Sequence, residues 1–129
     1  MTNEAIAADP EGPMAEMARR EGRVGGHTSF VAAEAGDPGA IRVVDEYTDY
    51  LACGVANLVN GLQPEVVGVG GGVGKQGERL LVPLRRKVSE ELYGRDYEDD
   101  RVTRLVSCTL GYKAGLVGAA MAAKVAYGE

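Results

Sequence analysis

The stretch VVGVGGGVG, residues 66–74, decides how this chain is expected to fold. Apolar residues at 66, 67 and 69 predict a short buried strand, and the glycines at 70–72 remove every side chain from the turn that follows. An amphipathic segment that reads as a helix then runs to Leu92. This order lets the backbone approach a ligand closely, because no Cβ stands in the way. A helix N-terminus there would also offer free N–H groups and a positive dipole to an anionic ligand.

A long amphipathic helix is predicted immediately upstream of this stretch. Asp37 suits its N-cap and Pro38 its first helical position. Apolar residues then recur at spacings of three and four over about seven turns, which is the pattern of a helix with one buried face. Gly61 and Pro64 end the pattern. The predicted buried stripe consists of Ile41, Val44, Thr48, Leu51, Val55, Leu58 and Leu62. Small residues at Ala52, Gly54 and Ala56 predict that another backbone packs closely against the second half of the helix.

The region from the glycine stretch onward predicts a β-α-β-α unit. An apolar stripe from Leu80 to Leu92 marks a helix that contains Pro83, and the proline is expected to bend it. β-Branched residues from Val102 to Ser107 predict a second strand. Small apolar residues at 114–126 predict a helix pressed tightly against a neighbour. The two strands should be parallel and joined by a right-handed crossover.

The N-terminal part carries weaker signals. Residues 1–12 lack periodicity and are expected to form a loose tail, which leaves residues 13–129 as the domain. A short helix is predicted from Met14 to a stop near Gly22. After a turn, Thr28 is expected to N-cap a second short helix.

Composition excludes several classes of protein. The chain has 129 residues and a net charge of −5, which argues against a nucleic-acid surface. No apolar run approaches the ~18 residues that a membrane helix needs, and no secretory signal is visible. Cys53 and Cys108 are expected to be buried free thiols of a cytoplasmic protein. His27 is expected to be a loop histidine, and the charged residues at 95–101 a solvated loop, so no metal site is predicted.

Two familiar phosphate-binding motifs do not fit the glycines well. A P-loop needs glycine, four residues and then Gly-Lys-Ser/Thr. Gly74-Lys75 is present, but Gln76 offers no hydroxyl for a metal ion. The segment GVGKQG, residues 72–77, matches the dinucleotide pattern G-x-G-x-x-G. The acidic residue expected about 20 positions later falls in a helical pattern, so this second match is weak.

The order of several motifs resembles the ROK family of sugar kinases and transcriptional repressors. NLVNGLQPEVVGVGGGV, residues 57–73, is similar to the family's NLINLLNPEVIVIGGGV. GERLLVPLR, residues 77–85, resembles GELLLEPLRE, including the helix proline. LGYKAGLVGAA, residues 110–120, resembles LGNDAGLIGAA, and AAEAGD, residues 32–37, resembles AAKAGD. The resemblance covers roughly residues 13–125 in the family's order.

The resemblance implies the C-terminal portion of an actin-like ATPase fold of the hexokinase type, in the α/β class and mostly helical with two parallel strands. It also implies ATP, with magnesium in the full-length family, and a hexose as the acceptor. The adenosine and ribose of ATP would then lie against the backbone of Gly70, Gly71, Gly72 and Val73, with Gly111 and Ala114 nearby. No catalytic residue and no metal ligand is assigned in this chain.

Departures from the family pattern limit the expected activity. Tyr112-Lys113 replaces the family's Asn-Asp, and a lysine in a first helical turn opposes the helix dipole. The family's phosphate loop, catalytic aspartate, Glu-x-Gly-His and cysteine cluster have no counterpart here. The chain is therefore expected to be a C-terminal, adenosine-side fragment of a glucokinase-like kinase, inactive alone and prone to self-association or to pairing with the missing half. A fragment of a sugar-sensing repressor domain and a non-catalytic helical interaction domain are the alternatives.

Overall fold

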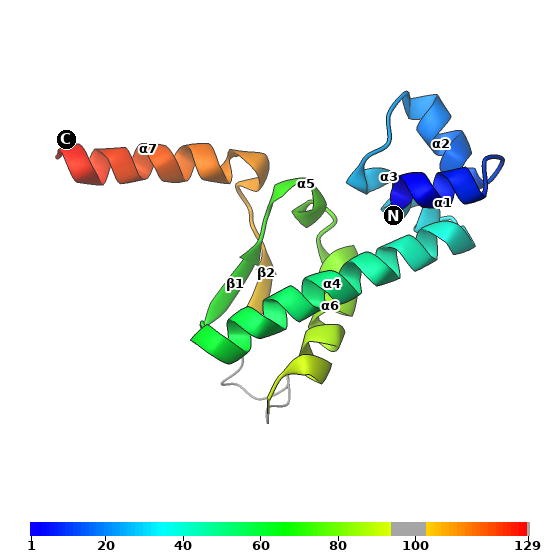
Figure 1. Ribbon diagram of the computed structural model, residues 1–129. Coiled ribbons are helices and arrows are strands. Elements are labelled where there is room, and N and C mark those ends of the chain that lie inside the picture. Colours follow the sequence, from blue (N-terminus) through cyan, green and yellow to red (C-terminus); the bar gives the residue numbers. More distant parts are fainter. Residues whose placement is uncertain (94–102, 129) are drawn as a thin grey trace.

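The computed structural model describes residues 1–93 and 103–128, and its helices and two strands follow one another along the chain as Figure 1 shows. The elements are α1 Thr2–Ala8, α2 Pro13–Glu21, α3 Gly26–Glu34, α4 Pro38–Leu62, β1 Val66–Val69, α5 Gly71–Gly74, α6 Glu78–Glu91, β2 Arg104–Ser107, the 3₁₀ helix η1 Gly111–Lys113, and α7 Ala114–Tyr127.

The two strands form a parallel pair, and α6 lies in the crossover between them (Figure 1). Val66 is paired with Arg104 and Val69 with Ser107. This confirms the predicted β-α-β unit. The prediction of a buried first strand is wrong, because Val66 is exposed and Val67 and Val69 are only half-buried. Helices α4 and α6 pack together and against one face of the pair, where Val67, Val69 and Leu105 join the main core. The buried members of that core are Ala52, Val55, Ala56, Val59, Leu81, Leu84, Val88, Leu92 and Leu105.

Helix α4 begins and ends close to the predicted positions, but its buried face is different. Thr48 and Val55 of the predicted stripe are buried, whereas Ile41, Leu58 and Leu62 are exposed. The contact with α6 is made instead by a face rich in small residues, including Ala52 and Ala56. Small side chains let two helix backbones approach closely, so the close packing predicted at Ala52 and Ala56 is confirmed, whereas Gly54 is exposed.

A buried lysine links α4 to α6 on the side of α4 that carries its acidic residues. Lys87 is 9% exposed, and its Nζ lies 2.6 Å from Asp45 Oδ1 and 2.5 Å from Asp49 Oδ1. Burial lowers the pKa of Lys87, but hydrogen bonds to the two carboxylates outweigh this and raise the pKa above its ordinary value. The lysine is therefore charged and holds the two helices in register.

The structure corrects two expectations at the N-terminal end. The loose tail predicted for residues 1–12 is wrong for residues 2–8, which form α1; Ala5 and Ile6 pack against the small cluster around Met14. Helix α3 begins earlier than predicted, with Gly25 as its N-cap. Thr28 lies one turn inside that helix, where its Oγ accepts a hydrogen bond from the Gly25 N–H at 3.1 Å.

Two further expectations about burial are wrong. Cys53 and Cys108 are free, as predicted, but Cys53 is exposed and Cys108 is only half-buried. Helix α7 forms as predicted, but none of its described residues is buried, and in Figure 1 it projects away from the other elements. The charged loop predicted at 95–101 lies outside the described residues. Within the described part of the chain, no helix is both long enough and apolar enough to cross a membrane.

Asp37 is expected to be the most important polar group of the N-terminal half. One of its carboxylate oxygens accepts from the Ala40 N–H at 2.9 Å, and the other accepts from the Met14 N–H at 3.0 Å. Asp37→Ala should lower the free energy of unfolding by about 2 kcal/mol, because it removes an N-cap and leaves a buried donor unpaired. Urea denaturation measures this, with Glu46→Ala on the exposed side of α4 as the charge-matched control, which should change stability little.

The same carboxylate gives the stability a defined pH dependence. Burial raises the pKa of Asp37, but hydrogen bonds from the backbone N–H groups of Ala40, Met14 and Gly39 outweigh it and hold the pKa below its ordinary value of 3.8. The unfolded chain therefore binds this proton more readily than the folded chain. The contribution of Asp37 to the free energy of unfolding is full above pH 3.8, and it is lost as the pH falls through the pKa of the folded state. A difference between the unchanged chain and Asp37→Ala that did not decrease at lower pH would contradict this.

Candidate functional site

The candidate site lies where both strands end. The carboxyl end of β1 leads into the turn at Gly70, and the carboxyl end of β2 leads to Cys108. The two loops are joined directly: the Cys108 N–H donates to the Val69 carbonyl at 2.9 Å, and the Ser107 hydroxyl donates to the Gly74 carbonyl at 2.8 Å. Ligands of parallel sheets bind at this end of the strands, where the loops converge.

The glycines of the turn differ in why the structure requires or allows glycine at each position. Gly71 has a φ of 74°, a conformation that side chains rarely adopt. A Cβ on Gly74 would lie 2.7 Å from the Val69 carbonyl oxygen, so the backbone leaves no room for one. A Cβ on Gly72 would meet nothing within 4 Å. Gly71 and Gly74 therefore shape the turn, whereas Gly72 leaves open space beside it.

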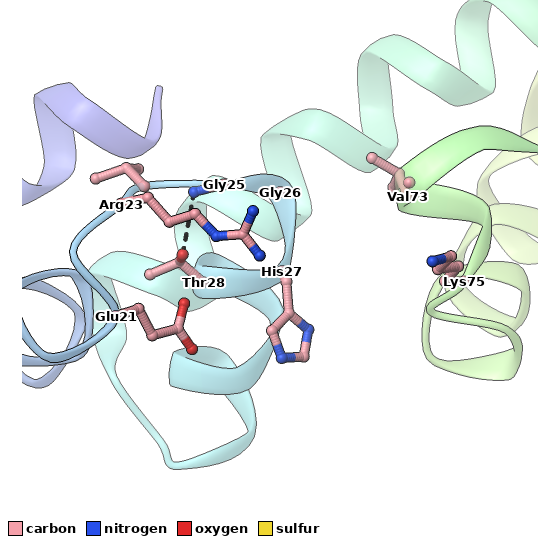
Figure 2. Close-up of a pocket in the computed structure, with 10 residues that line it drawn as sticks. Glu21, Arg23, Gly25, Gly26, His27, Thr28, Val73 and Lys75 are labelled. Atoms are coloured by element: carbon pink, nitrogen blue, oxygen red, sulfur yellow. Dashed lines mark hydrogen bonds between the residues drawn. The ribbon is translucent and has the colours of Figure 1, made fainter. Parts of the chain in front are cut away.

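A cleft of about 680 Å³ occupies that space. One wall is the glycine turn, through Gly72, Val73 and Lys75. The facing wall is the corner between α2 and α3, formed by Glu21 and residues 23–28. Figure 2 shows Val73 and Lys75 on one side of the opening and Arg23 and His27 on the other. The cleft thus combines bare backbone with a few charged side chains.

Direct contacts hold the two walls together. Gln76 Nε2 lies 3.4 Å from His27 Nδ1, and Arg79 at the start of α6 pairs with Glu34 at the end of α3, at 2.7 Å. A Cβ on Gly26 would come within 3.3 Å of a Val73 methyl group, so the backbone of α3 fits closely against the turn. These contacts connect α3 to the glycine turn and to the start of α6.

The structure brings together only some of the residues that the sequence assigned to the site. Gly72 and Val73 line the cleft. Gly70 and Gly71 belong to the same turn, and Gly111 begins η1, which packs against α5. Ala114 begins α7. None of these four is among the residues that line the cleft in the described part of the chain.

The facing wall was missed by the sequence analysis. Residues 23–27 read only as a turn, and His27 as a loop histidine. His27 is an exposed residue of α3, 49 positions away from its neighbour Gln76. No local sequence pattern predicts a contact between residues 49 positions apart. Among the described residues, no group of three or more side chains could hold a metal ion.

Comparison with known proteins establishes the family. The sequence profile of the ROK family matches residues 3–126. The chain is 34% identical over 118 residues to a glucokinase of Halalkalibacterium halodurans and 37% identical over 94 residues to one of Thermotoga maritima. Its structure matches a ROK glucokinase of Streptomyces griseus, solved with glucose and AMPPNP, with a TM-score of 0.75 and 30% identity. The chain belongs to the ROK family.

The match confirms the fold that the resemblance implied, which is part of an actin-like ATPase fold. It covers 94% of this chain but 39% of the S. griseus protein, and the H. halodurans match covers 92% of this chain but 35% of that relative. The chain therefore spans little more than a third of the length of these two relatives.

Proposed function

We propose that this chain carries the adenosine side of the nucleotide site of a glucokinase-like sugar kinase, which transfers phosphate from ATP to a hexose. The backbone of Gly70–Val73 would face the adenosine and ribose, with Gly111 and Ala114 beside it. The observation that carries the proposal is the cleft on the glycine turn at the carboxyl ends of β1 and β2. The AMPPNP complex of the S. griseus relative supports a nucleotide as the ligand class.

The physical character of the cleft fits a nucleoside. Its volume of about 680 Å³ is in the usual range for small-molecule sites. The turn offers backbone without side chains, against which a flat base and a ribose can lie closely. The charged groups, including Arg23 and Lys75, line the same opening and could hold the phosphates at its rim.

The chain is not expected to phosphorylate glucose by itself. Phosphoryl transfer needs groups that position the γ-phosphate, its magnesium ion and the acceptor hydroxyl. The family motifs that supply such groups have no counterpart in this sequence. We assign no described residue as a magnesium ligand. Binding of the hexose would need the rest of the fold. We assign the protein to the cytoplasm, because Cys53 and Cys108 are both free and cytoplasmic proteins keep their thiols reduced.

Titration calorimetry tests the proposal on the purified chain. ATP and adenosine should both bind, with dissociation constants within about tenfold of each other, a difference of less than about 1.4 kcal/mol, because most contacts are to the nucleoside. Inorganic tripolyphosphate should bind much more weakly than adenosine. Binding of tripolyphosphate without adenosine would assign the cleft to phosphate groups and contradict the proposal, as would the absence of heat with all three ligands.

A further inference from the structure

A second, smaller hollow adjoins the cleft, and we call it the back pocket. It has a volume of about 70 Å³ and is lined mainly by apolar side chains of α3, α4 and α5. Apolar hollows inside proteins stay dry and bind small apolar molecules, and one of about 150 Å³ accepts benzene. The back pocket therefore has room for an apolar group of a few carbon atoms. Its lining residues are Met1, Thr2, Gly26, Ser29, Phe30, Val43, Val44, Tyr47 and Val73.

The back pocket and the cleft share a thin partition. Gly26 of α3 and Val73 of α5 line both of them. A Cβ on Gly26 would lie 3.3 Å from a Val73 methyl group, so the two residues already meet closely. In Figure 2 the Val73 side chain extends from the glycine turn toward the α3 side of the opening. The partition at this point thus consists of one bare backbone and one valine side chain.

The walls of the back pocket other than this partition are firmly packed. Phe30 is 5% and Val43 7% exposed. The rings of Phe30 and Tyr47 meet edge to face, with centroids 6.5 Å apart and planes at 80°, which is a favourable arrangement for two aromatic rings. This pair joins α3 to α4. Shortening Val73 should therefore open the partition without closing the space behind it.

We propose that Val73 determines which nucleosides the cleft accepts, because its side chain closes the back pocket to a ligand on the glycine turn. The inference rests on the proposed function, since it takes the cleft as the nucleoside site. With Val73 in place, a purine base without an apolar substituent meets a closed wall and fits. A base that carries an apolar group on the edge facing the partition is excluded, because the group has no space to enter. Glycine at position 26 belongs to the same device, since it lets α3 meet Val73 closely.

Val73→Ala tests the proposal with adenosine and three analogues that carry a propyl group at N6, C2 or C8. Calorimetry gives the affinity of each analogue relative to adenosine, so that a general loss of nucleoside binding cancels. In the unchanged chain no analogue should bind better than adenosine. In Val73→Ala this relative affinity should rise at least about tenfold for one analogue or more, because the propyl group enters an apolar space. Val73 is half-buried and outside both core clusters, so this variant should remain folded, which its urea midpoint checks.

A second substitution should close the partition again. In the double variant Gly26→Ala/Val73→Ala, the new methyl group on α3 points at the space that the Val73 methyl group has left. The gain in relative affinity should therefore disappear. Val82→Ala is the matched control, because it shortens an exposed valine of α6 that lines neither hollow. It should produce no gain with any analogue.

Xenon tests the back pocket without any nucleotide. Xenon dissolved under pressure should shift the methyl NMR signals of Val43 and Val44 in the unchanged chain and leave those of Val82 in place. Absence of these shifts would overturn the proposal, because the back pocket would not exist in solution. Adenosine binding with no gain for any analogue in folded Val73→Ala would overturn the role of Val73 alone. Absence of adenosine binding by the unchanged chain would contradict the proposed function, and this inference with it.

Discussion

Gly72→Leu should weaken ATP binding by about 100-fold, or about 2.7 kcal/mol, and leave the fold unchanged. A Cβ at this position meets nothing within 4 Å, and its φ is not in the left-handed region, so the backbone can accept a side chain. The added leucine would then extend into the cleft that Gly72 lines and occupy space that we assign to the nucleoside. Calorimetric titration with ATP measures the change in affinity.

Gly61→Leu is the matched control for that substitution. Gly61 also has open space around its Cβ position, but it lies near the end of α4, outside the cleft-lining residues. The control should bind ATP as the unchanged chain does, and both variants should unfold at similar urea concentrations. If Gly72→Leu bound ATP with unchanged affinity, the turn would not be a wall of the nucleotide site.

Leu84→Ala is expected to cause the largest loss of stability, about 3 kcal/mol. Leu84 of α6 is fully buried, in the cluster that includes Val55 of α4 and Leu105 of β2. Truncation removes buried apolar surface and leaves a cavity that the close helix contact cannot fill. Urea denaturation should show the midpoint shifting strongly downward.

Val82→Ala, on the same helix, provides the comparison. Val82 is 59% exposed, so its truncation should change the free energy of unfolding by less than about 0.5 kcal/mol. Equal effects of the two substitutions would show that α6 does not pack through Leu84 and that the described core is wrong.

The sequence was most informative where local chemistry dictates the structure. Asp37-Pro38 marked the start of α4, and the apolar runs around the glycine turn placed β1 and α6. The motif order identified the family, which the comparisons confirm. The face of α4 was predicted in part. The close contact at Ala52 and Ala56 followed from their small size, but the spacing of the large residues wrongly buried Leu58 and Leu62, which are exposed.

The candidate site could be predicted from one side only. Its glycine wall is a continuous stretch of sequence, whereas the facing wall comes from the corner between α2 and α3, which only the tertiary fold brings near. The apolar composition of α7 predicted a helix packed tightly against a neighbour, whereas the fragment hypothesis predicted that an apolar helix face would lie open. The structure agrees with the second expectation, because no described residue of α7 is buried.

Mapping adenosine by NMR tests the central claim most directly. In a chain of this size, backbone amide shifts can be followed residue by residue while adenosine is added. The account predicts that the largest shift changes fall on residues 70–73, with smaller ones at Gly111, at Ala114 and on the facing wall at residues 23–28. Changes centred elsewhere, for example on the exposed groove between α1 and α2 around Ala15 and Arg19, or no change at millimolar adenosine, would contradict it.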